Sequence, residues 1–145
     1  MFKRLLIATD GSELAGKAVA TGLALAKGLD AQVVVFTATE PWTAMVSGEG
    51  FAFDFPVEEY EKDCAERAEQ ILKQVRGDAE RLGVACETVH ANGFPAESIL
   101  DAAKTKNCDL IVMASHGRRG ISRLLLGSQA MRVVTLSNIP VLICR

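Results

Sequence analysis

The 145-residue sequence lacks the cysteine pairs of zinc sites, the long apolar runs of membrane segments and the basic stripe of nucleic-acid grooves. Its four cysteines form no Cys-x-x-Cys pair, and only two histidines accompany them, which argues against a zinc site. No apolar run approaches the roughly 20 residues that cross a bilayer, so no membrane segment is expected. A net charge of −2 and scattered basic residues argue against a nucleic-acid groove, which needs a basic stripe. These absences leave an ordinary folded domain with one core.

The start of the chain and the cysteines indicate the compartment. The opening apolar run is too short for a signal peptide, and Asp10 interrupts it. We therefore expect a cytoplasmic protein, in which cysteines stay reduced. The expected buried, reduced thiols are Cys64, Cys86, Cys108 and Cys144.

Apolar periodicity predicts five strands and four helices that alternate along the chain. Strands are expected over residues 3–9, 32–39, 84–91, 109–115 and 141–145. Helices are expected over residues 13–27, 57–82, 95–106 and 128–137. Ser12 is the expected N-cap of the first helix, and Gly28 and Gly83 are the expected stops of the first two. This alternation predicts one α/β domain over residues 1–145, a doubly wound parallel sheet with helices on both faces. The strand order that we expect for it is 3-2-1-4-5.

Ligands of open parallel sheets bind at the carboxyl ends of the strands, where the strand order reverses. In the expected order that point lies between the first and fourth strands. The residues that leave these strands, 8–12 and 113–117, are small or polar. The second stretch continues through a loop of Gly, Ser and Arg to Gly127 and Ser128, where a helix is expected to begin. Bare backbone N–H groups, a hydroxyl and a helix N-terminus favour an anion there, so the segment predicts a bound nucleotide.

Five short motifs along the chain carry a family resemblance. They are Leu-Leu-Ile-Ala-Thr-Asp-Gly-Ser-Glu near the start, Gly-Phe-Pro-Ala-Glu-Ser-Ile-Leu from Gly93, Ser-His-Gly-Arg from Ser115, Leu-Leu-Gly-Ser from Leu125, and Pro-Val-Leu-Ile from Pro140. Together they resemble the universal stress protein family over essentially the whole chain. The resemblance implies the same fold and, through the ATP-binding members, a nucleotide ligand.

Those ATP-binding members carry the motif Gly-x2-Gly-x9-Gly-[Ser/Thr]. In this chain the second glycine is Gly117, and the third glycine and the hydroxyl are Gly127 and Ser128. Ala114 replaces the first glycine. A positive φ at this position would cost alanine on the order of 1–2 kcal/mol. An ordinary φ would only let the methyl group narrow the pocket.

The resemblance implies a role for each matching position. Asp10 would accept a hydrogen bond from the ribose or the adenine edge, and Arg118 would neutralise phosphate charge. Backbone N–H groups of Gly117, Gly127 and Ser128 would hold the phosphates. The adenine slot would be lined by Ala8, Thr9, Ala38 and Met113. The complete set of candidate nucleotide-binding residues is Ala8, Thr9, Asp10, Ala38, Met113, Ala114, His116, Gly117, Arg118, Gly127, Ser128 and Gln129.

Other roles stay open for the polar members of this set. Asp10 can cap the first helix together with Ser12, and Ser128 is a natural N-cap of the last one. His116 lies in a Ser-His-Gly turn and fits a hydrogen-bonded turn residue better than a catalytic base. The arginine pair that begins at Arg118 is also compatible with a solvated turn.

The connection over residues 40–56 is long for a strand-to-helix loop, where two to six residues are typical. It leaves the second strand on the side of the predicted pocket, and we interpret it as a cover over the nucleotide or a partner contact. The alternative is a hydrophobic flap packed on the core. Half of the aromatic residues of the chain lie in it, namely Trp42, Phe51, Phe53 and Phe55.

The last strand, from Val141 to Arg145, lies at an edge of the expected sheet. Its residues Val141, Leu142 and Ile143 are strongly apolar, and sheet edges have to be covered or paired. The family pairs this strand with its twin across a two-fold axis. The resemblance therefore implies a homodimer through this strand.

These features favour an adenine-nucleotide-binding stress-response regulator. ATP is the expected ligand, with or without Mg²⁺ or Mn²⁺, and AMP or ADP are open alternatives. No catalytic residue is assigned because no base, acid and orienting group converge, so we expect little or no hydrolysis. Two other functions stay open. One is a stress protein that has lost the nucleotide and acts through dimer or partner contacts, and the other is a slow ATPase.

Overall fold

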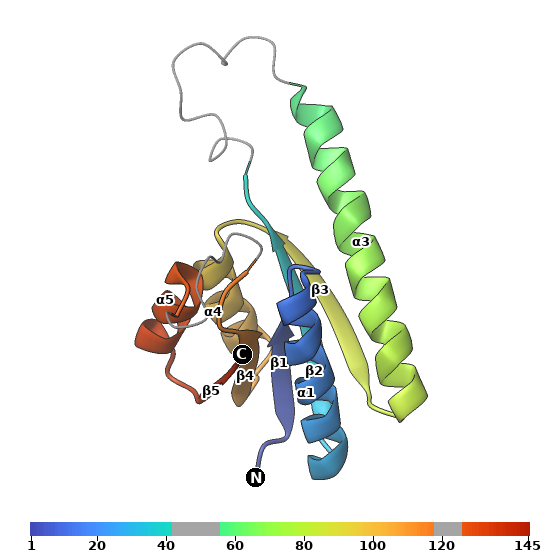
Figure 1. The fold of residues 1–145 in the computed structure, drawn as a ribbon, viewed down its shortest axis with the longest axis vertical. Helices are drawn as coiled ribbons and strands as arrows, with labels where there is room; N and C mark the ends of the chain where they lie inside the picture. The colour runs from blue at the N-terminus through green and yellow to red at the C-terminus, as the bar shows by residue number, and fades with distance from the viewer. Residues whose placement is uncertain (42–55, 118–125) are drawn as a thin grey trace.

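The computed structural model describes residues 1–41, 56–117 and 126–145. Figure 1 shows a sheet of parallel strands with helices packed along it. The strands are β1 (Arg4–Ala8), β2 (Gln32–Thr39), β3 (Cys86–Asn92), β4 (Leu110–Ala114) and β5 (Val141–Cys144). The helices are α1 (Glu13–Leu29), α3 (Val57–Leu82), α4 (Pro95–Thr105) and α5 (Ser128–Leu136). Their order is the predicted one, and no boundary differs from the expected one by more than two residues.

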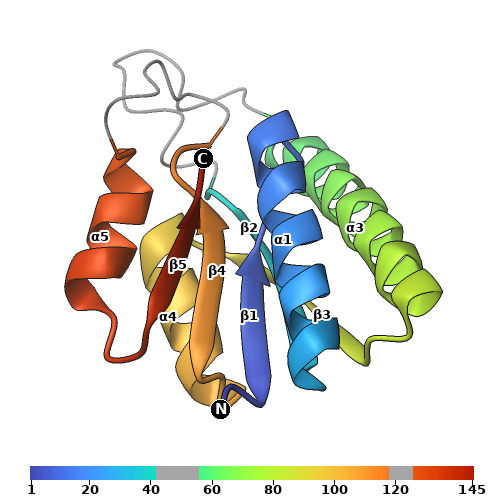
Figure 2. The same cartoon turned by 60° about the horizontal axis from the view of Figure 1, so that its bottom comes forward.

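All four strand pairs are parallel, and the strand order is β3-β2-β1-β4-β5. This order confirms the predicted doubly wound α/β sheet. The chain builds outward from β1 to β3 and then returns to place β4 on the other side of β1. Helices α1 and α3 consequently cover one face of the sheet, and α4 and α5 cover the other (Figure 2). The order reverses between β1 and β4, so a crevice is expected at the carboxyl ends of these two strands.

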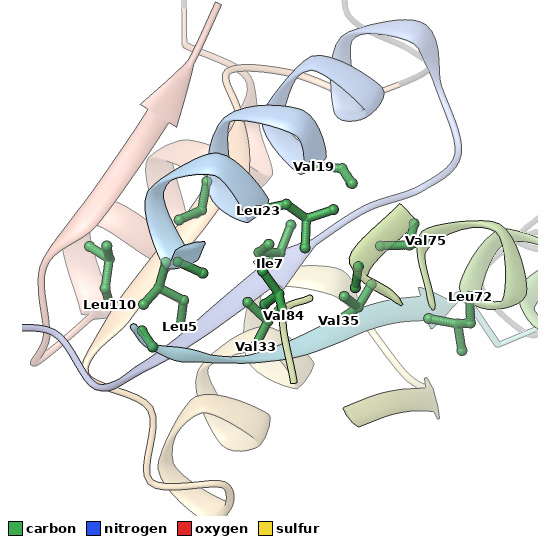
Figure 3. Packing of buried hydrophobic residues seen from close by; sticks show 14 residues of the cluster. Leu5, Ile7, Val19, Leu23, Val33, Val35, Leu72, Val75, Val84 and Leu110 are labelled. Atoms are coloured by element: carbon green, nitrogen blue, oxygen red, sulfur yellow. The ribbon is translucent and has the colours of Figure 1, made fainter. Parts of the chain in front are cut away.

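The central strands are buried on both faces, which explains their continuous apolar sequences. Along β2, Val33 and Val35 pack under α1 and α3, whereas Val34 and Phe36 pack under α4 and α5. None of these four side chains is more than 1% exposed. Figure 3 shows the first of these two clusters, in which Leu23 of α1 lies against the sheet. The two clusters fix the sheet between its helices and so fix the ends of the strands.

The ends of α1 confirm one capping prediction and correct another. The hydroxyl of Ser12 accepts a hydrogen bond from the Ala15 N–H at 3.3 Å, so Ser12 is the N-cap as predicted. The prediction that Gly28 stops the helix is wrong, because α1 continues to Leu29. Asp30 ends it instead, with a left-handed backbone (φ 52°, ψ 44°), and aspartate is one of the few residues that tolerate this conformation.

The start of α5 corrects a second capping prediction. Gly127 is the N-cap residue, with an extended backbone, and Ser128 is the first residue inside the helix. The Ser128 side chain is therefore one position too late to cap the helix. The predicted stop of α3 holds, because Gly83 ends that helix with a left-handed φ of 71°.

The cysteines are free thiols, but the prediction that all four are buried is wrong. Cys108 is buried, whereas Cys64, Cys86 and Cys144 are half-buried. Cys86 and Cys144 lie on the two edge strands of the sheet. Burial raises the pKa of Cys108 to about 11, so this thiol stays protonated at neutral pH. Over the same described ranges, no helix has the length and apolar character that crossing a membrane requires.

Candidate functional site

A cavity of about 430 Å³ lies at the carboxyl ends of β1, β2 and β4. The strands end at one edge of the sheet, toward which the arrowheads of β1, β4 and β5 point in Figure 2. The first turns of α4 and α5 close the cavity on the side away from α1. Its described lining consists of Ala8, Thr9, Asp10, Ala15, Phe36, Ala38, Glu40, Pro95, Ile99, Met113, Ala114, His116, Gly117, Gly127, Ser128, Gln129 and Ala130.

The candidate residues that the structure describes meet around this one cavity. They come from four separate segments of the chain, which the parallel sheet and α5 bring to the same edge. Arg118, the remaining candidate, lies outside the described residues. So does most of the aromatic loop over residues 40–56, and its covering role therefore stays a prediction. The binding role of each residue stays a prediction.

Six lining residues were not predicted, and two simple signals would have found three of them. Side chains alternate along a strand, so Phe36 and Glu40 share the face of the predicted Ala38. Pro95 begins a helix whose N-terminus must lie at the same edge as the strand ends. No sequence signal marked the others, which are Ala15, Ile99 and Ala130.

Asp10 and Gly117 approach each other closely across the reversal of strand order. One carboxylate oxygen of Asp10 accepts a hydrogen bond from the Ser12 N–H at 2.9 Å, so Asp10 does support the start of α1. The other oxygen, Oδ2, would lie 2.7 Å from a Cβ atom placed on Gly117. The φ of Gly117 is not positive, so its backbone conformation does not call for glycine. What matters is that the absence of a side chain makes room for the Asp10 carboxylate.

Gly127 is held tightly against the loop that leaves β4. Its N–H donates to the Ser115 carbonyl at 2.8 Å, and an added Cβ atom would lie 3.0 Å from that same oxygen. The predicted phosphate donor at Gly127 is therefore already engaged. The N–H groups left to face an anion here are those of the first turn of α5, beginning with Ser128 and Gln129.

Ala114 has an ordinary backbone conformation, which decides between the two possibilities for this position. It is the last residue of β4 and pairs with Cys144 of β5. The non-glycine residues with positive φ in the described chain are Asp30 and Asn107, so alanine carries no backbone penalty at position 114. Ala114 is among the residues that line the cavity.

His116 and Gln129 make local hydrogen bonds within the cavity wall. The hydroxyl of Ser115, which is buried, lies 3.0 Å from His116 Nδ1, as expected for a turn residue. The side-chain oxygen of Gln129 accepts from the Ala96 N–H at 3.1 Å. Since the N-cap residue of α4, Phe94, offers no side-chain acceptor, Gln129 caps α4 from the neighbouring helix. This hydrogen bond ties the α4 side of the cavity to α5.

The charges of the lining are arranged unevenly. Two carboxylates line the cavity, Asp10 at the end of β1 and Glu40 just beyond β2, and the described lining contains no lysine or arginine. The N-termini of α4 and α5 also line the cavity, so the positive ends of two helix dipoles lie beside it. No group of three or more histidine, cysteine or acidic side chains is close enough for metal binding within residues 1–41, 56–117 and 126–145.

A doubly wound sheet with a cavity at its strand-order reversal is the arrangement in which open α/β domains bind ligands. A family model described as the universal stress protein family matches residues 1–145. Universal stress protein YxiE of Bacillus subtilis is 34% identical, and a universal stress protein of Thermus aquaticus is 41% identical, with 100% of this chain and of each relative covered. The chain belongs to the universal stress protein family.

Solved structures share the fold. The structure of MJ0577 from Methanocaldococcus jannaschii has a TM-score of 0.84 at 28% identity and covers 99% of this chain and 96% of that one. A universal stress protein in complex with cAMP has a TM-score of 0.74 at 22% identity and covers 99% and 97%. One from Archaeoglobus fulgidus in complex with dAMP has a TM-score of 0.70 at 20% identity and covers 100% and 98%.

Proposed function

We propose that this protein binds an adenine nucleotide, with ATP as the first candidate and AMP or ADP as alternatives. The observation that carries the proposal is the order of groups around one cavity. An apolar slot lies over Phe36 and Met113, a carboxylate stands at Asp10, and the first turn of α5 offers N–H groups at Ser128. A nucleotide needs these three surroundings: an apolar slot for the base, an acceptor for the hydroxyl donors of the sugar, and N–H groups for the phosphate.

The family comparison supports the same class of ligand. The two relatives with cAMP and dAMP bound share the fold at 22% and 20% identity. Their ligands are both adenine nucleotides. For this chain, ATP itself and a companion Mg²⁺ or Mn²⁺ are proposals that rest on the cavity. Mg²⁺ usually keeps several waters and is held largely by substrate phosphates, so its binding would not require a cage of protein ligands.

We propose a regulatory role in the stress response with little or no hydrolysis. General acid–base catalysis needs a positioned proton acceptor within hydrogen-bond reach of the attacking group. His116 has its Nδ1 engaged by the Ser115 hydroxyl, and within the described residues no carboxylate bonds to its ring to orient it. A change of shape or of partner affinity with the bound nucleotide fits this lining better than turnover. Incubation with ATP and chromatography for ADP and AMP separates a slow ATPase from a binder.

We further propose a homodimer formed through β5, in a cytoplasmic protein. β5 is an edge of the sheet in the described chain, so the outer side of this strand is available to a second copy. Its side chain Leu142 is 36% exposed. Large apolar side chains are also exposed on the neighbouring helix α5, namely Met131, Val134 and Leu136. An apolar edge strand beside an apolar helix face suits burial against a twin.

The decisive test is thermal unfolding with ATP, ADP and AMP, together with mass identification of any small molecule released from freshly purified protein. Binding to the folded state alone stabilises by about 2.7 kcal/mol at a ligand concentration 100 times the Kd. We expect a rise in melting temperature with at least one of these nucleotides. No rise at millimolar concentration would favour the alternative, a stress protein that acts through partner contacts without a nucleotide.

A further inference from the structure

Glu40 places an unusual group in the cavity wall. It follows β2 directly and shares the cavity-facing side of that strand with Phe36 and Ala38. The side of the cavity along β2 is therefore apolar and ends in the carboxylate of Glu40, at what we call the rim of the cavity. Within the described part of the chain, this carboxylate has no hydrogen-bond or ion-pair partner. Ionised carboxylates only accept hydrogen bonds, so Glu40 can serve a ligand that donates one.

The backbone of Glu40 is fixed by a contact from α3. The hydroxyl of Tyr60 donates to the Glu40 carbonyl at 3.0 Å. Tyr60 lies in the first turns of α3, the part of this helix that extends past the strand ends in Figure 1. Burial raises the pKa of Tyr60, so the phenol keeps its proton and stays a donor at neutral pH. The rim of the cavity at β2 is thus tied to a rigid helix.

The order of charges across the sheet gives a bound nucleotide its direction. Of the two helix N-termini, α4 has its Ala96 N–H already bonded to Gln129, which leaves the first turn of α5 to face an anion. Carboxylates stand at Asp10, after β1, and at Glu40, after β2. Like charges repel, so the phosphate of a nucleotide has to lie toward α5. The uncharged end, the base, then lies over β2 and meets the Glu40 carboxylate.

We propose that Glu40 is the specificity-determining residue for the base. Its carboxylate accepts a hydrogen bond from the exocyclic amine of adenine, and Tyr60 is the positioning residue that holds Glu40 at the rim. This role rests on the proposed nucleotide binding. It predicts discrimination against a purine that lacks the amine, because the half-buried rim carboxylate would then lose its water without gaining a donor.

The test compares ATP with purine riboside 5′-triphosphate, in which hydrogen replaces the exocyclic amine, by isothermal titration calorimetry. We expect the wild-type protein to bind ATP about tenfold more tightly, as one hydrogen bond to a charged group allows. Glu40→Ala should bind the two nucleotides equally. Glu40→Gln keeps a neutral acceptor oxygen and should retain part of the preference, because neutral hydrogen bonds are weaker.

The outcomes separate the two proposals. If the wild-type protein binds neither nucleotide, the proposed function is overturned and the role of Glu40 is overturned with it. If both nucleotides bind with the same affinity, nucleotide binding stands and only the role of Glu40 is lost. The role of Glu40 is likewise lost if Glu40→Ala weakens both ligands by one factor and leaves their ratio unchanged.

The positioning role of Tyr60 has its own readout. Tyr60→Phe keeps the ring and removes the donor, and we expect the affinity ratio between the two nucleotides to fall two- to fivefold. Thr88→Val is the matched control, because it removes the hydrogen bond from Arg76 that ties α3 to the sheet at β3. This control should leave the ratio unchanged. A merely structural Tyr60 would change the melting temperature and both affinities but not their ratio.

Discussion

At the scale of single residues, the cavity depends on two glycines that lie so close to neighbouring atoms that an added Cβ atom would make those atoms move. Gly117 faces Asp10 and Gly127 faces the Ser115 carbonyl, both at distances that exclude a Cβ atom without movement. At Ala114 the backbone φ is ordinary and the methyl group fits. The departure from the glycine motif therefore falls at a position where alanine carries no backbone penalty, whereas a Cβ atom at either matching glycine would make a neighbouring group move.

A methyl group at position 117 tests this reasoning. Gly117→Ala would place a Cβ atom 2.7 Å from Asp10 Oδ2 and push the carboxylate away from its position. The obstructing atom ends a side chain that can rotate, so we expect the free energy of unfolding to fall by no more than about 1 kcal/mol. Affinity for ATP, measured by titration calorimetry, should fall about tenfold, equivalent to about 1.4 kcal/mol.

The control for that variant is Gly16→Ala, since a Cβ atom on this exposed α1 glycine meets nothing within 4 Å. It should leave ATP affinity unchanged and raise stability slightly, because alanine is the better helix former. Equal affinities of wild type and Gly117→Ala would show that the Asp10 carboxylate has no part in nucleotide binding.

At the scale of elements, an ion-pair cluster joins the other end of the sheet. Arg4 of β1 pairs with Glu87 of β3 at 2.6 Å and donates to Gln32 of β2 at 2.9 Å. Lys106, at the end of α4, also pairs with Glu87. The cluster links three adjacent strands and one helix at the end opposite the cavity. It contributes to the stability of the sheet at the end away from the cavity.

Glu87 gives this cluster a pH dependence. The hydrogen bond from Lys106, followed by the charges of Lys106 and Arg4, holds the pKa of Glu87 below its ordinary value of 4.5. A lowered folded-state pKa means that the stabilisation is complete above about pH 4.5 and is lost as the pH falls through the folded-state pKa. Because Glu87 is 39% exposed, the stabilisation is only about 0.5–1 kcal/mol.

Urea unfolding of wild type and Glu87→Gln at several pH values measures this contribution. The stability difference should be largest near pH 7 and should shrink as the pH is lowered below about 4.5. Glu69→Gln, on the exposed side of α3, controls for the loss of one surface charge. A difference that stays constant, or that grows toward acid, would contradict the assignment.

At the scale of the whole molecule, the two edges of the sheet differ in character. β3 presents Glu87, Thr88 and His90 along one edge, and polar, charged strands resist pairing with another chain. β5 is short and apolar, and exposed apolar side chains of α5 accompany it. A second copy is therefore expected to add at β5, which would extend the sheet through the dimer.

A proline on β5 tests the edge-pairing model. Pro140 and Cys144 accept hydrogen bonds from β4 through their carbonyls, so the alternate residues, Ile143 among them, direct their backbone groups outward. Ile143→Pro removes one outward N–H and should shift a dimer to monomer in sedimentation velocity. Ile143→Val keeps the N–H and should remain dimeric. A dimer that survives the proline would place the interface elsewhere.

The predicted residues that leave strand ends lie around one cavity, and their role in binding stays a prediction. Asp10, Met113 and Gly117 were predicted because they leave strands at the reversal of strand order. Glu40 was missed, although strand alternation would have placed it beside Ala38. The engagement of the Gly127 N–H had no signal in the sequence, because its acceptor lies on a different segment.

The sequence by itself determined the fold class and the edge of the sheet where the polar strand ends gather. These follow from hydrophobic periodicity, from the alternation of strands and helices and from the handedness of their connections, which are properties of neighbouring residues. The tertiary structure alone decided that Gln129 caps α4, that Tyr60 holds Glu40 and that Gly117 faces Asp10. Each of these contacts joins distant segments, and its geometry depends on how the helices and strands pack together.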